Sequence, residues 1–523
     1  MNTNEFLEIS ATIVPKRTAI TFDDSHISFQ ELREMADRLA NVLVNLGIKA
    51  GDTVAMLDVN TPQVLVAYFA CAKMDAIFVP LNYRAKEDEL RHMLVVSNAS
   101  VLFVGNRYIS LVNKVTKRTE SNLKVIVIGG PDIQSWFSYE RLMRHCVERH
   151  EFIPTSEDRD TTILLFTSGT TGFPKAVMLS HNSFSSYMLS SIDPVDPDIE
   201  ESNLLCVPLY HIAGLQACLA GIYAGRTLVM MRQFEPLEWM QLVEKNRVQR
   251  SGIVPTMLKQ ILDHPRFCEF DLSSLKVISY GAAPMPTTVI KQAIIKLPKI
   301  QFINAFGQTE TASTITMLSP DDHVLEGSKQ EIEKKLIRLQ SVGKPLPDIE
   351  VKIFDEDGNE LSSGVTGEVA CRGPRMMSGY WNDEEATKSA FQDGWLFTGD
   401  LGYKDQDGYI YLSGRSKDFI KRGGEMISPV EIERILIDHP EVDDAAVIGV
   451  PDEEWGERVR ALIVLAPGKS ISRSRLIEDV HSKLASFKTP ESIIFVDSLP
   501  HNHLGKILKR ELRKKYSYRI ENE

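Results

Sequence analysis

Helix-like and strand-like segments alternate along the first part of the sequence, and this alternation constrains the fold class most. Ser28 and Glu31 form a capping box at the start of a predicted helix, apolar residues then recur every three or four positions, and Gly47 is placed to end it. The alternation continues over residues 53–59 (strand), 63–75 (helix), 76–81 (strand) and 123–129 (strand). We therefore predict an α/β fold of layered subdomains with largely parallel sheets.

The pattern changes near residue 350. Residues 350–373 read as two strands around the turn DEDGN, which predicts a β-rich subdomain. Residues 428–484 then alternate between helix and strand patterns over a length sufficient for a small α+β domain of about 100 residues. We place the boundary near Arg415 to Asp418, and predict a large domain over residues 1–416 and a small domain over residues 417–523.

Charge and composition exclude several classes of protein. The net charge of −12 argues against a nucleic-acid partner, because phosphate contacts need a basic surface. The first ten residues carry Glu5 and Glu8 and no apolar core, so no signal peptide is expected. The most apolar run, residues 212–225, is too short for an integral membrane segment. The six cysteines form no C-x-x-C pair, which predicts neither a zinc site nor a disulfide framework and fits a cytoplasmic protein.

The stretch TSGTTGFPK, residues 167–175, is a candidate phosphate-binding loop. Its hydroxyl groups and glycine N–H groups can donate hydrogen bonds, and Lys175 supplies positive charge. It is not a Walker loop, which would need G-x-x-x-x-G-K-S/T at the start of a helix. Pro174 disfavours helical angles at Phe173, so we expect a loop between two strands, with the chain leaving it in an extended conformation.

Four later stretches add the other groups that a nucleotide site needs. Asp400, in WLFTGDLG, can accept hydrogen bonds from both hydroxyls of a ribose, and Glu310, in NAFGQTET, can hold Mg²⁺ on the phosphates. Lys506, in PHNHLGKILKREL, can neutralise an α-phosphate. Arg415 stands at the predicted domain joint, beside a double glycine.

With these motifs together, the sequence resembles the adenylate-forming enzyme superfamily: acyl- and aryl-CoA synthetases, firefly luciferase and the adenylation domains of nonribosomal peptide synthetases. The resemblance covers nearly the whole chain, and its motifs occur in family order. They are LLFTSGTTGFPKAVMLSH, SYGAAPM, NAFGQTET, SVGKPLP, GEVACRGPRMMSGYWND, DGWLFTGDLG, GRSKDFIKRGGEMISPVEIE and LPHNHLGKILKREL. Phe306 stands where the family usually has tyrosine, which keeps an adenine-stacking face without the hydroxyl.

The resemblance implies a role for each matching residue. Lys506, Thr167 and Glu310 are expected to be catalytic, and Thr167 and Glu310 to hold Mg²⁺. The residues expected to bind ATP or AMP are Thr167, Ser168, Gly169, Thr170, Thr171, Gly172, Lys175, Gly281, Ala282, Ala283, Asn304, Ala305, Phe306, Gly307, Gln308, Thr309, Asp400, Arg415 and Lys506. Those expected to bind the acyl group are His211, Val254, Gly281 and Gly307, and those expected to bind coenzyme A are Arg422, Gly423, Gly424 and Glu425. Lys417 corresponds to the hinge on which a mobile small domain turns.

The implied reaction has two steps. A carboxylic acid attacks the α-phosphate of Mg·ATP to give acyl-AMP, and a thiol then displaces AMP. We predict an acid–CoA ligase, with loading of a carrier protein or luciferase-like chemistry as alternatives from the same family. A nucleotide-binding protein without activity is the alternative from another class, and intact Lys506 and Glu310 argue against it. The sequence leaves a homodimer open.

The residues near the expected acyl pocket are small or apolar apart from His211. We therefore expect the substrate to be a medium-chain, alicyclic or aromatic monocarboxylic acid with an uncharged tail, because a second charge would be buried without a partner. Gly281→Leu is expected to fill the pocket and favour shorter acids.

Overall fold

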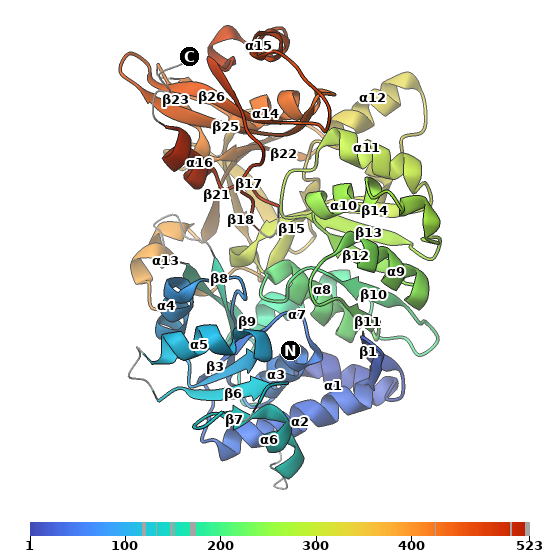
Figure 1. Cartoon of the computed structure of the whole chain (residues 1–523). Coiled ribbons are helices and arrows are strands. Elements are labelled where there is room, and N and C mark those ends of the chain that lie inside the picture. The colour runs from blue at the N-terminus through green and yellow to red at the C-terminus, as the bar shows by residue number, and fades with distance from the viewer. Residues whose placement is uncertain are drawn as a thin grey trace.

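The computed structural model describes residues 1–117, 122–131, 133–146, 150, 152–167, 174–423, 425–502 and 505–517. Its large region contains two mixed sheets with helices against their faces (Figure 1). In spatial order, the first sheet consists of β16 (Lys344–Pro345), β15 (Ser313–Leu318), β14 (Gln301–Gln308), β13 (Val277–Gly281), β12 (Arg250–Ile253), β10 (Ser202–Leu205), β11 (Thr227–Met230), β1 (Thr18–Phe22) and β2 (Ser25–Ser28). The second consists of β19 (Gly379–Tyr380), β9 (Lys175–Ser180), β8 (Thr161–Thr167), β4 (Ile77–Pro80), β3 (Thr53–Leu57), β5 (Val101–Gly105), β6 (Lys124–Ile128) and β7 (Phe137–Ser138).

Most neighbouring strands in the middle of both sheets run parallel, which confirms the prediction from the alternating pattern. The predicted first helix is α2 (Phe29–Asn45), and Ser28 and Glu31 form its capping box. Gly47, two residues past its end, has φ of +82°, a conformation that glycine adopts without strain.

Side chains alternate between the two faces of the first sheet, so each face packs against different helices. On β10, Leu204 belongs to the core under α9 (Pro236–Asn246), α10 (Pro255–Leu262) and α11 (Thr287–Lys296). Its neighbour Leu205 belongs to the core that contains α8 (Ile212–Tyr223). The sheet is therefore enclosed between helices, and α8 covers the face on which the candidate site lies.

The other helices of the large region surround these two sheets (Figure 1). They are α1 (Asn4–Ile13), α3 (Pro62–Lys73), α4 (Glu87–Ser97), α5 (Ile109–Thr116), α6 (Tyr139–His145), α7 (His181–Ser191), α12 (Lys329–Arg338) and α13 (Glu384–Ala390).

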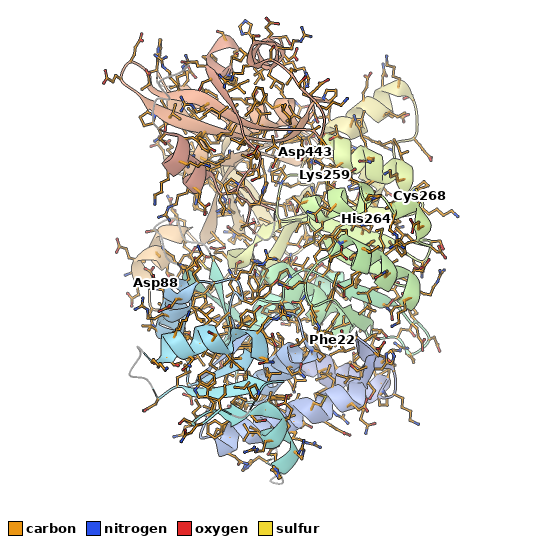
Figure 2. All side chains as sticks on the ribbon, viewed as in Figure 1. Phe22, Asp88, Lys259, His264, Cys268 and Asp443 are labelled. Atoms are coloured by element: carbon orange, nitrogen blue, oxygen red, sulfur yellow. The ribbon has the colours of Figure 1, made fainter. Side chains whose placement is uncertain are left out.

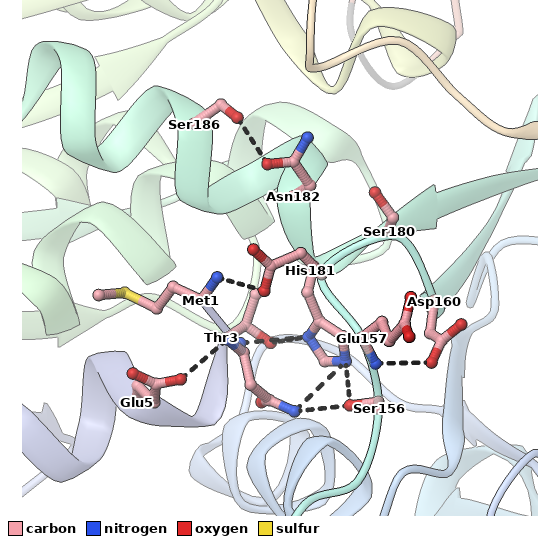
Figure 3. A network of polar contacts seen from close by, with 12 residues as sticks. Met1, Thr3, Glu5, Ser156, Glu157, Asp160, Ser180, His181, Asn182 and Ser186 are labelled. Carbon is pink, nitrogen blue, oxygen red and sulfur yellow. Dashed lines mark hydrogen bonds and ion pairs between the residues drawn. The ribbon is translucent and has the colours of Figure 1, made fainter.

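A buried histidine at the start of α7, directly after strand β9, holds the start of the chain (Figure 3). The Thr3 backbone N–H donates to His181 Nδ1 at 3.1 Å, and the Asn2 side chain bonds to Ser156 at 2.9 Å. Burial lowers the pKa of His181 to about 4, so the ring is neutral and accepts this hydrogen bond. The Met1 amino group also pairs with Asp158.

A third, β-rich sheet links the large region to the small one, as predicted. Its strands are β17 (Glu350–Phe354), β18 (Gly367–Arg372), β21 (Trp395–Lys404), β20 (Phe391–Gln392) and β22 (Ile410–Arg415). The chain leaves this sheet at Arg415, passes through a 3-10 turn at Ser416–Asp418, and enters a fourth sheet at Ile420. The predicted boundary falls within this turn.

The fourth sheet has its own core and caps the molecule in the view of Figure 1. Its strands are β24 (Glu425–Ile427), β23 (Ile420–Arg422), β26 (Gly456–Leu465), β25 (Val442–Asp452) and β27 (Ser492–Phe495), and its helices are α14 (Pro429–Ile437), α15 (Arg473–His481) and α16 (Lys509–Tyr516). In the part of the chain that the structure describes, no helix is both long enough and apolar enough to cross a bilayer.

Candidate active site

A cavity of about 490 Å³ runs between α8 and the first sheet and opens toward the small domain. Many residues singled out in the sequence line it. They are Thr167, His211, Val254, Gly281, Ala282, Ala305, Gly307, Gln308, Thr309, Glu310, Arg415 and Lys506. Several strands and helix starts of the large region and one loop of the small domain thus contribute to one space.

Other predicted residues do not line this cavity. They are Lys175, Ala283, Asn304, Phe306, Asp400, Lys417, Arg422, Gly423 and Glu425. Ser168, Gly169, Thr170, Thr171, Gly172 and Gly424 lie outside the described residues. The strands on either side of the candidate phosphate loop are described: Thr167 ends β8, Lys175 begins the antiparallel β9, and the two residues pair. This confirms that the stretch connects two strands and that the chain leaves it in an extended conformation.

Lys506 reaches the cavity from a tight loop of the small domain. Its backbone N–H donates to Asn502 Oδ1 at 2.9 Å, and its carbonyl accepts from the Asn502 N–H at 2.8 Å. Burial, and then the charge of Arg415, lower the pKa of the Lys506 ammonium to about 8. The lysine is therefore poised for an anion that would compensate its burial.

Arg415 and Asp400 form an ion pair beside Lys506. They face each other on β22 and β21, and Arg415 Nε lies 3.1 Å from Asp400 Oδ1 without forming a hydrogen bond. Asp400 is buried, and its N–H is held by Thr398 Oγ1 at 3.1 Å. Burial raises the pKa of the neighbouring Glu368. A hydrogen bond from the Gly399 N–H lowers this pKa, and the negative charge of Asp400 raises it.

Glu310 and Lys175 both contact Tyr380. The Tyr380 hydroxyl donates to Glu310 Oε1 at 3.0 Å. The Lys175 ammonium lies 5.1 Å from the Tyr380 ring centre and 3.6 Å from Asp383 Oδ2. In this arrangement Lys175 is engaged by Asp383 and does not line the cavity.

Glu310 and Thr167 offer the oxygen atoms that Mg²⁺ prefers. Within the described residues, no group of three or more His, Cys, Asp or Glu side chains is suited to a metal. Mg²⁺ is commonly held by one or two carboxylates together with substrate phosphates, so a single glutamate at the cavity fits such an ion.

Close backbone contacts shape the edge of the cavity. Gly281 and Ala305 pair on β13 and β14, and a Cβ at Gly281 would lie 2.1 Å from the Ala305 carbonyl oxygen. The expectation that Gly281→Leu simply fills the pocket is therefore wrong, since any side chain there collides with the sheet itself. Ala282 has φ of +66°, an uncommon conformation for a residue with a Cβ. Its backbone is thus held in a constrained geometry at the cavity wall.

Charged and polar residues occupy the far end of the cavity, which corrects a second expectation. Arg226, Arg250 and Gln216 line the cavity. Asn203 pairs with Arg250 and donates to the carbonyl of Ala217, the neighbour of Gln216, at 3.5 Å, so this part of α8 lies at the same end. Arg226 Nε donates to Glu201 Oε2 at 3.0 Å, and an Arg250 Nη lies 3.5 Å from the same oxygen. Burial, and then the charge of Arg226, lower the pKa of Arg250. The pocket is thus not free of inward-facing charge.

Sequence reasoning missed the two arginines for a physical reason, and it placed Gln216 in a pocket stretch without giving its amide a role. Arg226 and Arg250 lie at the starts of β11 and β12, outside the family motifs, and only the parallel pairing of these strands with β10 brings them together. Gln216 lies within an apolar helix pattern. Its polar amide interrupts the otherwise apolar residues 212–223, and this interruption was the signal in the sequence that could have pointed to it.

The predicted coenzyme A residues lie within the small domain. Arg422 donates to the Phe487 carbonyl at 2.7 Å, pairs with Glu491, and lies over the Trp455 ring at 5.6 Å. The Gly423 N–H donates to the Trp455 carbonyl at 2.8 Å. This turn is not brought together with Lys506 at the cavity.

Lys417 lies in the turn between the third and fourth sheets. Burial, and then the charge of Arg415, lower its pKa. The next residue, Asp418, accepts from Arg513 of α16 at 3.0 Å.

Comparison with known proteins agrees with this geometry. Residues 7–381 match the AMP-binding enzyme family, and residues 431–506 match the AMP-binding enzyme C-terminal domain. The chain is 31% identical to an indoleacetate–CoA ligase of Aromatoleum aromaticum, covering 98% of each chain. It is 34% identical to a fatty acid–acyl-carrier-protein ligase of Streptomyces coeruleorubidus, covering 96% of this chain and 94% of that one.

The fold also matches solved structures. An anthranilate CoA ligase in complex with anthranoyl-AMP superposes with a TM-score of 0.88 at 26% identity, covering 98% of this chain and 97% of the other. The chain therefore belongs to the AMP-binding enzyme family, and it is an ATP-dependent, adenylate-forming enzyme of the acyl- and aryl-CoA ligase group.

Proposed function

We propose that the enzyme converts a carboxylic acid and ATP into acyl-AMP and pyrophosphate, and then transfers the acyl group to the thiol of coenzyme A with release of AMP. One observation carries this proposal. Lys506 of the small domain lines the same cavity as Thr167, Glu310 and Arg415. This arrangement supports the first half-reaction.

Two anions must meet in that step. A carboxylate and a phosphate oxygen about 4 Å apart repel by roughly 4 kcal/mol at an effective dielectric constant near 20. The Lys506 ammonium offsets this repulsion between the two groups and stabilises the charge that develops on the phosphorus oxygens. The carboxylate attacks phosphorus, the bond to pyrophosphate breaks, and no side-chain nucleophile takes part.

The remaining roles follow from position. Asp400, held by Arg415, would accept hydrogen bonds from the ribose hydroxyls. Gly281 to Ala283 and Asn304 to Thr309, at the strand ends beside the cavity, would hold the adenosine, and the loop from Thr167 to Lys175 the phosphates. When bound by Glu310 and Thr167, Mg²⁺ would neutralise part of the phosphate charge.

The second half-reaction needs another arrangement of the small domain. Arg422, Gly423 and Glu425 do not line the cavity while Lys506 does. We propose that the domain over residues 417–523 rotates about Lys417. The rotation would withdraw Lys506 from the cavity and bring the segment with Arg422, Gly423 and Glu425 to it, so that coenzyme A reaches acyl-AMP.

The substrate of this proposal is an acid of medium-chain, alicyclic or aromatic size. Small residues such as Gly252 and Ser279 line the cavity beyond the nucleotide-site residues and leave room for a chain or ring, which supports such an acid over acetate. The names of the relatives, which include an indoleacetate ligase and a fatty-acid ligase, also favour this range. We propose a cytoplasmic location, which cell fractionation tests.

A carrier protein is the second candidate acceptor. The relative named for an acyl-carrier-protein ligase keeps this alternative open. Coenzyme A and a pantetheinylated carrier protein, offered separately, distinguish the two by which thioester forms.

The proposal is tested by the two half-reactions of Lys506→Ala. Acyl-AMP formation, measured by ATP–pyrophosphate exchange over a panel of acids, is expected to fall at least about 100-fold, the low end for removing an electrostatic stabiliser. Thioester formation from supplied acyl-AMP is expected to change far less. Equal losses in both steps, or no exchange with any acid in the wild type, would contradict the proposal.

A further inference from the structure

The part of the cavity beyond Gly281, where the acyl group is expected, is a channel. Strands of the first sheet form one side of it, called the floor here, and polar residues line the end farthest from Lys506, called the far wall. Alternate residues of three adjacent strands form its floor: Arg250 and Gly252, then Val277, Ser279 and Gly281, then Ile303 and Ala305. Gln216, Ala217 and Ala220 of α8 line the channel as well. Small side chains along the middle leave the space, and larger polar ones stand at the far end.

The length of the channel follows from strand geometry. Gly281 pairs with Ala305 at the end near Lys506, and Val277 pairs with Arg250 at the other end. Four residues of strand span about 13 Å at the usual rise of roughly 3.3 Å per residue. An extended chain advances about 1.2 Å per bond. An acid of about ten carbons therefore spans the whole distance, and one of about six carbons spans it if the Arg250 side chain extends into the channel.

The charges at the far wall do not cancel. Arg226 and Arg250 share the single carboxylate of Glu201, at 3.0 Å and 3.5 Å. Tyr187 also lines this end, and Arg375 beside it is paired with Asp348 at 2.6 Å. Among the described groups that contact or perturb Arg250, the balance is one positive charge. A partly buried excess charge favours an anion as its partner.

An amide supplies a second, independent observation. Gln216 is only 5% exposed and lines the cavity, and its Nε2 has no hydrogen-bond partner among the described residues. A buried donor without an acceptor costs free energy, which a ligand acceptor at this position removes. Two donors from different elements, Gln216 on α8 and Arg250 on β12, therefore border the same channel.

We propose that the preferred substrate carries a second carboxylate at the end of its chain, which Arg250 and Gln216 bind while the first carboxylate is activated near Lys506. This inference rests on the proposed ligase function and defines its substrate class. It replaces the expectation of an uncharged tail. The alternative role of Arg250 is structural, in which it only helps Arg226 to hold Glu201 at the strand ends.

Matched acids test the proposal by kcat/KM for AMP formation. The panel compares hexanoate, octanoate and decanoate with the corresponding dicarboxylates, and includes the monomethyl ester of octanedioate, which keeps length and acceptor atoms but lacks the second charge. We expect the best dicarboxylate to exceed its matched monocarboxylate and the ester by about 10-fold or more, as for a desolvated charge pair. Arg250→Met is expected to remove this preference and Gln216→Leu to reduce it.

Arg247→Met is the matched control, because Arg247 is exposed, lies three residues away and pairs with Asp271. It is expected to leave the preference unchanged. Arg250→Lys, which retains the charge, guards against a variant that fails to fold. A monocarboxylate preference in the wild type, or a dicarboxylate preference that survives in Arg250→Met, would overturn the proposal.

Binding separates this inference from the proposed function. Octanedioate is expected to raise the Tm of the wild type more than octanoate does, since a ligand stabilises the state that it binds, and Arg250→Met is expected to abolish the difference. This readout needs no turnover. No AMP formation with any acid would refute the ligase proposal, whereas equal Tm shifts for the two acids would refute the second-carboxylate site.

Discussion

If Lys506 acts as proposed, the charge of this one side chain sets the pH dependence of the first half-reaction. Burial and Arg415 lower its pKa to about 8, well below that of an exposed lysine. A lowered pKa means that the ammonium is lost as pH rises through about 8, so kcat/KM for acyl-AMP formation is expected to fall above that pH. Because kcat/KM reports ionisations of the free enzyme, the unliganded pKa is the relevant one.

Lys506→Arg is the control for this pH profile. Arginine keeps its charge throughout the accessible range, so the decline above pH 8 is expected to disappear even though activity is lower. The same decline in Lys506→Arg would assign it to another group.

Single residues also mark where sequence reasoning failed. Lys506, Glu310 and Thr167 were found because they stand in motifs, and the cavity brings them together. Arg250 stands in no motif, and its meaning depends on strand pairing. The burial of its charge is a property of the folded sheet, which local sequence does not encode.

At the scale of elements, we expect the connection that carries Lys506 to tolerate little change. Gly505 has φ of +71°, and a Cβ there would lie 2.5 Å from Thr256 Oγ1 at the start of α10. Gly505→Ala is expected to lower the rate of acyl-AMP formation at least about 10-fold, because adding a methyl group to a closely packed contact displaces the loop. Thioester formation from supplied acyl-AMP is expected to persist.

Gly468→Ala serves as the matched control. Gly468 lies in the same domain with φ of +72°, and a Cβ there meets nothing within 4 Å. Both variants carry the same backbone strain, so a similar fall in acyl-AMP formation in both would show that strain, and not the contact with Thr256, is responsible.

Two glycines of the first sheet, one on β13 and one on β12, are expected to differ in what their substitution changes: the stability of the fold or the choice of acid. Gly281→Leu is expected to lower Tm markedly, because its side chain meets the Ala305 carbonyl oxygen of the adjacent strand. At Gly252 a Cβ would lie 3.3 Å from Ser279 Oγ, so Gly252→Ala is expected to keep the fold and shift kcat/KM toward shorter acids. Thermal unfolding and an acid chain-length series measure the two effects. Equal Tm losses would contradict this distinction.

For the whole molecule, most of the architecture could be predicted from pattern and spacing. The alternation of helices and strands predicted parallel layers, because period and caps are local properties of the sequence. The turn at Ser416–Asp418 lies where two sheets meet. What remained hidden was the contact between the large and small domains, since pairs such as Lys259 and Asp443 are far apart in sequence and lie on surfaces without a periodic signal.

We expect Lys417 to control which half-reaction the molecule is arranged for. Its turn joins two sheets, and proline would restrict φ there and remove a backbone N–H. Since Lys506 already lines the cavity, Lys417→Pro is expected to retain acyl-AMP formation and to lose thioester formation at least about 10-fold through restricted turning of the domain. A proline elsewhere in this region, such as Lys421→Pro, is a poor control because it would disturb a strand. Lys417→Ala is the better control, because it leaves the turn free to rotate. Normal thioester formation in Lys417→Pro would contradict a hinge at this position.

The ion pair between Lys259 of α10 and Asp443 of β25 bridges the two domains on the outside of the molecule (Figure 2). Both side chains are partly exposed, at 36% and 42%, so the pair is worth at most about 1 kcal/mol and shifts the domain equilibrium by no more than roughly fivefold.

Lys259→Ala is expected to weaken the arrangement that buries Lys506. Acyl-AMP formation should fall modestly, and thioester formation from supplied acyl-AMP should rise by a similar factor. Lys245→Ala removes an exposed pair with Asp24 inside the large domain and should change neither rate. Parallel changes of both rates in Lys259→Ala would show that the contact stabilises the fold and does not select between two domain positions.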